Sequence, residues 1–176
     1  MLWQHHNIID NVPPKQHITA MTDTLVGLER LAMEFIIYTG ITPQELIRIR
    51  KSDLISNTIK IYDVKLNRFR NVIVPKNLFK KLPNGIHDLN QIIFNFSVYK
   101  LNEALKTSSE KVLGPGYTYT WHSLHLFYIE ISNVNNIPLE IVAENMGVSP
   151  NKLFKYFKSR IEKNKNCVDN LYEQKN

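Results

Sequence analysis

The stretch from residue 119 to residue 156 places the strongest constraint on the fold, because it divides into short helices separated by two turns. Three helices are predicted, over residues 122–134, 138–146 and 150–163. Gly147 fits the turn before the last helix, which Ser149 can cap and Pro150 can begin. The carboxyl-terminal third of the chain is therefore expected to hold a packed helix pair, a turn and a third helix.

The upstream half predicts further helices. They are expected from Thr22 to Thr39, over residues 42–50, from Pro75 to Leu82, and over residues 87–107. Gly40 ends the first of them, and Thr42 with Glu45 fits a capped helix start. Residues 107–116 are expected to form a loop.

Strands are predicted between the second and third of these helices. Residues 54–62 and 64–74 are rich in Ile, Val and Tyr with partial alternation, which is typical of two or three short antiparallel strands. The expected fold class is therefore mixed α+β, mainly α-helical, with a small antiparallel β-sheet.

The length of 176 residues fits one domain, and 43% hydrophobic residues are enough for a core. Three regions are expected: a linker or arm over residues 1–20, a folded domain over residues 21–163 and a flexible tail over residues 164–176. No apolar run approaches the ~18 residues that cross a bilayer, so no membrane contact is expected. The single cysteine, Cys167, cannot form an internal disulfide and favours a reducing cytoplasmic compartment.

An excess of basic residues points to a polyanionic partner, with nucleic acid first. The chain has 22 Lys and Arg against 16 Asp and Glu, and a pI near 9.3. The basic residues cluster at Arg48–Lys51, Lys65–Arg70, Lys76–Lys81 and Lys152–Lys165. Because the acidic residues are scattered, these clusters are candidate contacts with phosphate.

The segment "PLEIVAENMGVSPNKLFKYFKSR" also fits a helix-turn-helix motif. Ala143 allows two helices to approach closely, and Gly147 lies at the turn. The outer face of the last helix would carry Asn151, Lys152, Lys155 and Lys158. Such a helix can lie in a major groove, where lysine meets phosphate or guanine and asparagine can read adenine. An amphipathic helix pair with a solvated basic face is the alternative interpretation.

Four segments in this order resemble the catalytic domain of the tyrosine recombinase (phage integrase) family. They are "YTGITPQELIRIRKSDL" (38–54), "VKLNRFRNVIVP" (64–75), "HSLHLFYI" (122–129) and "IPLEIVAENMG" (137–147). A tyrosine follows the last glycine by nine residues. The resemblance covers about Thr22 to Arg160 and implies an integrase catalytic-domain fold that binds double-stranded DNA.

In that family a tyrosine attacks a DNA phosphate, and two arginines stabilise the charge that develops on its oxygens. By the resemblance, the two arginine positions fall on Thr42 and His125. The remaining family positions fall on Lys65 (hairpin lysine), His122 (first histidine), Val148 (second histidine) and Tyr156 (nucleophile). Both arginines are therefore missing, and so is one histidine.

Losing one preorganised donor typically costs a factor on the order of 10²–10³ in rate. We therefore expect no catalytic residues and no enzymatic activity. The expected function is a sequence-specific DNA-binding protein that acts as a transcriptional repressor or regulator of a phage or mobile element. The alternative is an active recombinase with a rearranged site, in which Lys65, His122 and Tyr156 would act. A protein-interaction module whose basic face binds an acidic partner is a third hypothesis.

The residues expected to contact DNA come from the helix ends, the hairpin and the last helix. They are Arg48, Lys51, Lys65, Arg68, Arg70, His122, His125, Ser149, Asn151, Lys152, Lys155 and Lys158. Further expected partners are a second copy of the chain on a palindromic site and an amino-terminal core-binding domain, which the family carries and this sequence lacks. No cofactor and no metal site are expected.

Overall fold

The computed structural model describes residues 7–9, 11–64, 67–83, 88–154 and 156. The helices in this part are α1 (Lys15–Asp23), α2 (Gly27–Thr39), α3 (Pro43–Leu46), α4 (Lys76–Phe79), α5 (Val98–Leu113), α6 (Trp121–Val134) and α7 (Leu139–Met146), with a 3-10 turn at Lys51–Asp53. The strands are β1 (Asn7–Ile9), β2 (Leu54–Ile55), β3 (Thr58–Asp63), β4 (Arg68–Ile73) and β5 (Tyr117–Tyr119). Residues 150–154 and 156 are also helical.

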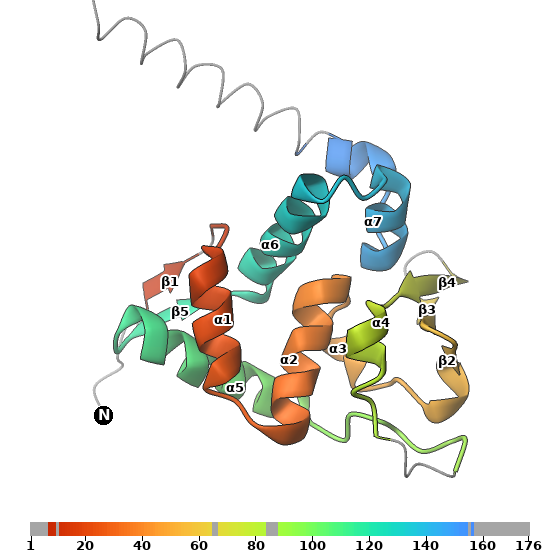
Figure 1. The fold of residues 1–176 in the computed structure, drawn as a ribbon, viewed down its shortest axis with the longest axis horizontal. Coiled ribbons are helices and arrows are strands. Elements are labelled where there is room, and N and C mark those ends of the chain that lie inside the picture. Colours follow the sequence, from red (N-terminus) through yellow and green to blue (C-terminus); the bar gives the residue numbers. More distant parts are fainter. Residues whose placement is uncertain (1–6, 10, 65–66, 84–87, 155, 157–176) are drawn as a thin grey trace, which may run out of the picture.

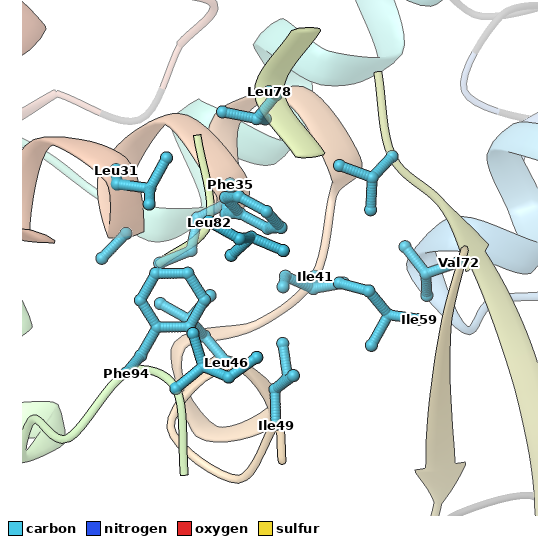
Figure 2. Packing of buried hydrophobic residues seen from close by; sticks show 14 of the residues in the cluster. Leu31, Phe35, Ile41, Leu46, Ile49, Ile59, Val72, Leu78, Leu82 and Phe94 are labelled. Atoms are coloured by element: carbon cyan, nitrogen blue, oxygen red, sulfur yellow. The ribbon is translucent and has the colours of Figure 1, made fainter. Parts of the chain in front are cut away.

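The central helix α2 is buried on both of its faces (Figure 1). One face contributes Phe35 and Ile36 to a core that includes the inner side of the three-stranded sheet and Phe94 (Figure 2). The opposite face contributes Met33 and Ile37, which pack with α1, α5 and α6. Because apolar residues surround it, α2 is the scaffold on which the two halves of the fold are assembled.

The order β2-β3-β4 forms an antiparallel sheet, as the sequence predicts. Its register pairs Ile59 with Val72 and Ile61 with Arg70, so these side chains share the inner face. Pro75 then ends the sheet and α4 follows, again as predicted.

The prediction of a linker over residues 1–20 is wrong for two segments of that range. Strand β1 pairs in parallel with β5, and α1 begins at Lys15. Ile18 and Met21 lie on one face of α1 and are completely buried. The helix predicted from Thr22 is in fact divided, because α1 ends at Asp23 and Val26 is extended before α2.

The helix predicted over residues 87–107 begins only at Val98. Upstream of it, residues 89–93 run beside residues 49–52, where Ile93 N donates to Ile49 O at 2.9 Å and Lys51 N donates to Gln91 O at 3.0 Å. These backbone bonds give the apolar residues of this segment an extended conformation instead of a helix.

The loop predicted over residues 107–116 is mostly the second half of α5. Ser97 caps the start of this helix by accepting from Lys100 N at 3.1 Å. Ser108 and Ser109 are buried inside it, and both hydroxyls donate to Leu105 O. Because these polar groups are satisfied within the helix, two serines that favour a loop in the sequence do not end it.

The helices α6 and α7 confirm the prediction for residues 122–134 and 138–146 to within a residue or two. They enclose a third core of Leu126, Tyr128, Ile129, Val142, Ala143 and Leu153. In Figure 1 α7 lies beside β4 of the sheet, and the two elements are in contact. The carboxyl-terminal helices are therefore attached to the sheet as well as to α6.

Candidate nucleic-acid interface

The structure brings together the two positions that the resemblance assigns to arginines. Thr42 is the N-cap of α3, and His125 lies in the first turns of α6. The His125 Nε2 atom is 3.2 Å from Ile41 O, the carbonyl of the residue before Thr42. The two positions therefore lie in one site, which we call the centre. Neither of their side chains carries a permanent positive charge.

The backbone N–H and the hydroxyl of Thr42 already form hydrogen bonds at the start of its own helix, α3. Its backbone N–H donates to Glu45 Oε2 at 2.9 Å, and its hydroxyl accepts from Glu45 N at 3.3 Å. This is the reciprocal capping box that the sequence predicts for this turn. A carboxylate, that of Glu45, consequently lies in the centre.

His125 is largely buried, and its surroundings favour the neutral imidazole. Burial lowers its pKa below the ordinary value, and the charge of His122 lowers it further, whereas the bond to Ile41 O and the carboxylate of Glu45 act in the opposite direction. Because the net shift is downward, His125 is uncharged at neutral pH. It cannot replace the positive charge of an arginine.

Arg70 forms an ion pair with Glu45 of this centre, but its side chain has no exposed surface. Its Nη1 donates to Glu45 Oε1 at 2.8 Å, its Nε donates to Glu144 O at 2.9 Å and its Nη2 donates to Asn145 O at 3.1 Å. These bonds join α3, β4 and the carboxyl end of α7. The prediction that Arg70 contacts DNA is therefore wrong for this arrangement, in which the guanidinium holds elements of the protein together.

Gly147 completes the same junction. It ends α7 in the left-handed region with φ +63°, and a Cβ atom there would lie 2.8 Å from Asp63 Oδ2 and 3.0 Å from Arg70 Cζ. The close approach of the buried Asp63 and Arg70 explains why this turn has a glycine. The turn predicted at this position is confirmed.

Asn145 fixes α7 to the edge of the sheet. Its side-chain amide donates to Ile73 O at 3.0 Å, and its Oδ1 accepts from Ile73 N at 2.9 Å. The same amide donates to the Tyr128 hydroxyl at 2.9 Å, so one buried side chain links β4, α6 and α7. Nothing in the local sequence pattern distinguishes this asparagine from an exposed one.

Other predicted contact residues lie on the surface. Arg48, His122, Ser149, Asn151 and Lys152 are exposed, and Lys51 is partly exposed. Arg68 is exposed but pairs with Glu144 at 2.9 Å. Lys65, Lys155 and Lys158 lie outside the described residues.

Tyr156 lies half-buried at the end of the described chain. It packs against the third core, whose buried members include Leu153. Its ring is therefore at least in part a packing group, which is the role an aromatic residue has most often at such a position.

Within the described residues, no group of three or more His, Cys, Asp or Glu side chains could hold a metal ion. In that same part of the chain, no helix has the length and apolar character needed to cross a membrane.

Comparison with known proteins bears on the fold alone. No family model and no curated protein matches the chain. Among solved structures, it is similar to the catalytic domain of bacteriophage HP1 integrase (TM-score 0.65, 16% identity, 84% of this chain and 87% of that one). It is also similar to XerA recombinase (TM-score 0.64, 15% identity, 80% of this chain) and to a lambda integrase dimer bound to a COC' core site (TM-score 0.64, 15% identity, 84% of this chain). The chain spans 57% of the XerA chain and 47% of the lambda integrase chain. The fold is thus that of a tyrosine recombinase catalytic domain.

Proposed function

We propose that this chain is a duplex-DNA-binding protein that uses a recombinase-like fold without cutting DNA. The proposal depends on one observation. The two positions where the family places arginines hold Thr42, bonded within its capping box, and His125, whose pKa is lowered by burial. Of the described cations near the Glu45 carboxylate, Arg70 is buried and already bonded to it, and Arg48 lines the adjoining cavity instead of occupying either family position.

The size of the expected loss in reaction rate argues against DNA cleavage. One missing charge-stabilising donor costs a factor on the order of 10²–10³ in rate, and the second loss adds to it even though such effects are rarely additive. Arg70 does not compensate, because moving its guanidinium to a phosphate would break its buried contacts with Glu45 and Asp63.

Duplex binding is supported by exposed basic and polar residues on the final helix and at the start of α6. Lys152, Asn151 and Ser149 follow the Gly147 turn on the outside of the final helix, and His122 lies at the exposed start of α6. The backbone N–H groups at the start of a helix favour a phosphate. Lysine and asparagine on an exposed helix can contact phosphates and base edges.

The biological role we propose is regulation of a phage or other mobile element, as a repressor that occupies a site. A second copy on a palindromic site would raise the affinity by linking two contacts. An amino-terminal core-binding domain would do the same by enclosing the duplex.

The second candidate function is an active recombinase with a rearranged site. It is favoured by the exposed His122 at the start of α6 and by a tyrosine, Tyr156, on the helix that follows α7. Lys65 would then protonate the leaving oxygen.

A nicked suicide substrate distinguishes the two functions. The expected result is binding of the duplex in a gel shift without a covalent protein–DNA product. A covalent band with the wild-type protein that is absent with Tyr156→Phe would overturn the proposal and establish the recombinase. A protein that binds no duplex even at low salt would overturn both functions and favour the protein-interaction hypothesis.

A further inference from the structure

The outward face of the β3–β4 hairpin carries an aromatic surface that is exposed in the described part of the chain. Side chains alternate along these strands, with Ile59 and Ile61 facing the core and Lys60 and Tyr62 facing outward. In the antiparallel register Tyr62 lies opposite Phe69 and Lys60 lies opposite Asn71. We call Lys60, Tyr62, Phe69 and Asn71 the hairpin face.

The two rings of the hairpin face are exposed and held in a fixed arrangement. Tyr62 is 47% exposed and Phe69 is 57% exposed. Their centroids are 5.1 Å apart with an interplanar angle of 64°, and the Tyr62 hydroxyl donates to the side chain of Asn67. The rings therefore stand on the sheet with part of their surface open to solvent.

The positively charged side chains of Lys60 and Arg48 lie near these rings. Lys60 Nζ lies 4.4 Å from the centroid of Phe69. A cavity of about 250 Å³ adjoins the face, and its lining includes Arg48, Lys60, Tyr62, Phe69 and the carboxylates Glu45 and Asp53.

Those two carboxylates are already bonded. Glu45 accepts from Arg70 at 2.8 Å, and Asp53 accepts from Arg50 N at 2.8 Å. Neither Arg48 nor Lys60 forms an ion pair with another residue of the described chain. Arg48 and Lys60 are therefore cations beside the rings that have no ion-pair partner among the described residues.

We propose that the hairpin face binds single-stranded DNA, by stacking unpaired bases on Phe69 and Tyr62 while Lys60 and Arg48 contact the phosphates. Exposed aromatic rings beside cations on a sheet fit this ligand, because every unpaired base offers a π face and every linkage a negative charge. Duplex DNA is a poor match, since its base faces are covered by their neighbours in the stack. The inference goes beyond the proposed function, because it assigns a second ligand to a different face.

Fluorescence anisotropy on the full chain tests this inference with a labelled oligothymidine strand and, separately, a labelled duplex. Phe69→Ala and Tyr62→Ala are each expected to weaken oligothymidine binding by roughly 5- to 150-fold, the usual effect of removing a stacked ring. Both should leave duplex affinity unchanged within about twofold, the margin expected for a ring that makes no duplex contact. Tyr99→Ala is the matched control, since Tyr99 is a 72% exposed ring on α5.

Substitutions that keep part of the ring's character separate stacking from simple apolar docking. Phe69→Tyr keeps a π face and should retain binding, whereas Phe69→Leu keeps an apolar side chain and should lose it. Far-ultraviolet circular dichroism would verify that each variant is folded, as expected for an exposed position.

The inference is overturned if the wild-type chain does not bind oligothymidine, or if Phe69→Leu binds it as well as wild type. The second result would indicate an apolar contact, such as a protein partner or a second copy. An equal loss of single-strand and duplex binding in Phe69→Ala would also overturn it. Single-strand binding without duplex binding would support this inference and reject the proposed function.

Discussion

At the scale of single residues, one arginine of this protein, Arg70, stabilises the fold from a buried position. The guanidinium of Arg70 bonds one carboxylate and two carbonyls of the α7 end, so the largest fully buried side chain is also a charged one. An exposed arginine two residues earlier, Arg68, makes a single surface ion pair. Substituting each arginine therefore compares the contributions of a buried and an exposed ion pair on the same strand to the free energy of unfolding.

Arg70→Met should lower the free energy of unfolding by about 3–5 kcal/mol, because it removes a buried guanidinium that bonds Glu45 and two carbonyls of α7 and lies beside the buried Asp63. Arg68→Met is the control and should cost less than about 1 kcal/mol, since its pair is exposed. Urea unfolding monitored by circular dichroism measures both. Equal losses for the two variants would contradict the structural role of Arg70.

His125 predicts a pH dependence of stability. Its pKa is below 6.5 in the folded protein and near 6.5 in the unfolded chain, so the unfolded state binds more protons in this range. Stability is therefore unaffected well above this range and falls as the pH decreases through 6.5, until the folded protein is protonated too. Glu45 acts in a separate window, because its lowered pKa contributes stability that is lost only below about 4.5.

The measurement is the melting temperature at several pH values from neutral to about pH 5, above the range of the carboxylates. His125→Gln, which keeps a donor for Ile41 O, should show a smaller decrease than wild type. His122→Gln, on the exposed start of the same helix, should keep most of the decrease. A wild-type slope in the His125→Gln variant would refute the assignment.

At the scale of elements, the turn between α7 and the final helix is closely constrained. A side chain at position 147 meets both an unfavourable φ and the buried Asp63 and Arg70, whereas Gly116 has a positive φ with no atom within 4 Å of its would-be Cβ. Alanine substitutions at the two glycines therefore distinguish the energetic cost of backbone strain from that of steric conflict.

Gly116→Ala should cost about 1–2 kcal/mol, the price of left-handed backbone strain alone. Gly147→Ala should cost a further 1–3 kcal/mol or so, because the added methyl overpacks the junction. Chemical denaturation measures both. Identical values would show that the junction around Arg70 relaxes freely.

The elements that the sequence predicts are those specified by local chemistry. The capping box of Thr42 and Glu45, the end of α2 at Gly40 and the turn at Gly147 each depend on residues a few positions apart. The extended segment before α5 could not be predicted, because its partners, residues 49–52, lie about 40 positions away in sequence. The burial of Arg70 escaped prediction for the same reason, since Glu45 and Glu144 are distant in sequence.

At the scale of the whole molecule, exposed cations lie at more than one place on the described fold. Lys152 lies beyond the Gly147 turn, and α5 lies at the opposite end of the fold in Figure 1. Substitutions at the two ends can therefore be compared by the salt dependence of DNA binding, because its slope reports how many phosphates the protein contacts.

Lys152→Ala should weaken duplex binding on all sequences and reduce the slope of log K against log salt by about 0.9, the contribution of one phosphate contact. Lys111→Ala, in the last turn of α5, should leave the slope unchanged. Anisotropy titrations at several salt concentrations provide both slopes. An unchanged slope in Lys152→Ala would remove the final helix from the proposed interface.

The amide of Asn145 has a mechanical consequence. It bonds both backbone groups of Ile73 on β4, and Gly147 follows it by two residues. Together with the bonds of Arg68 and Arg70 to the end of α7, it fastens the hairpin to the turn that precedes the final helix. A ligand that touches both would find them at a constant separation. DNA binding through both contacts would therefore tolerate sequence changes between the two contacted positions, but it would be weakened by a base pair inserted between them.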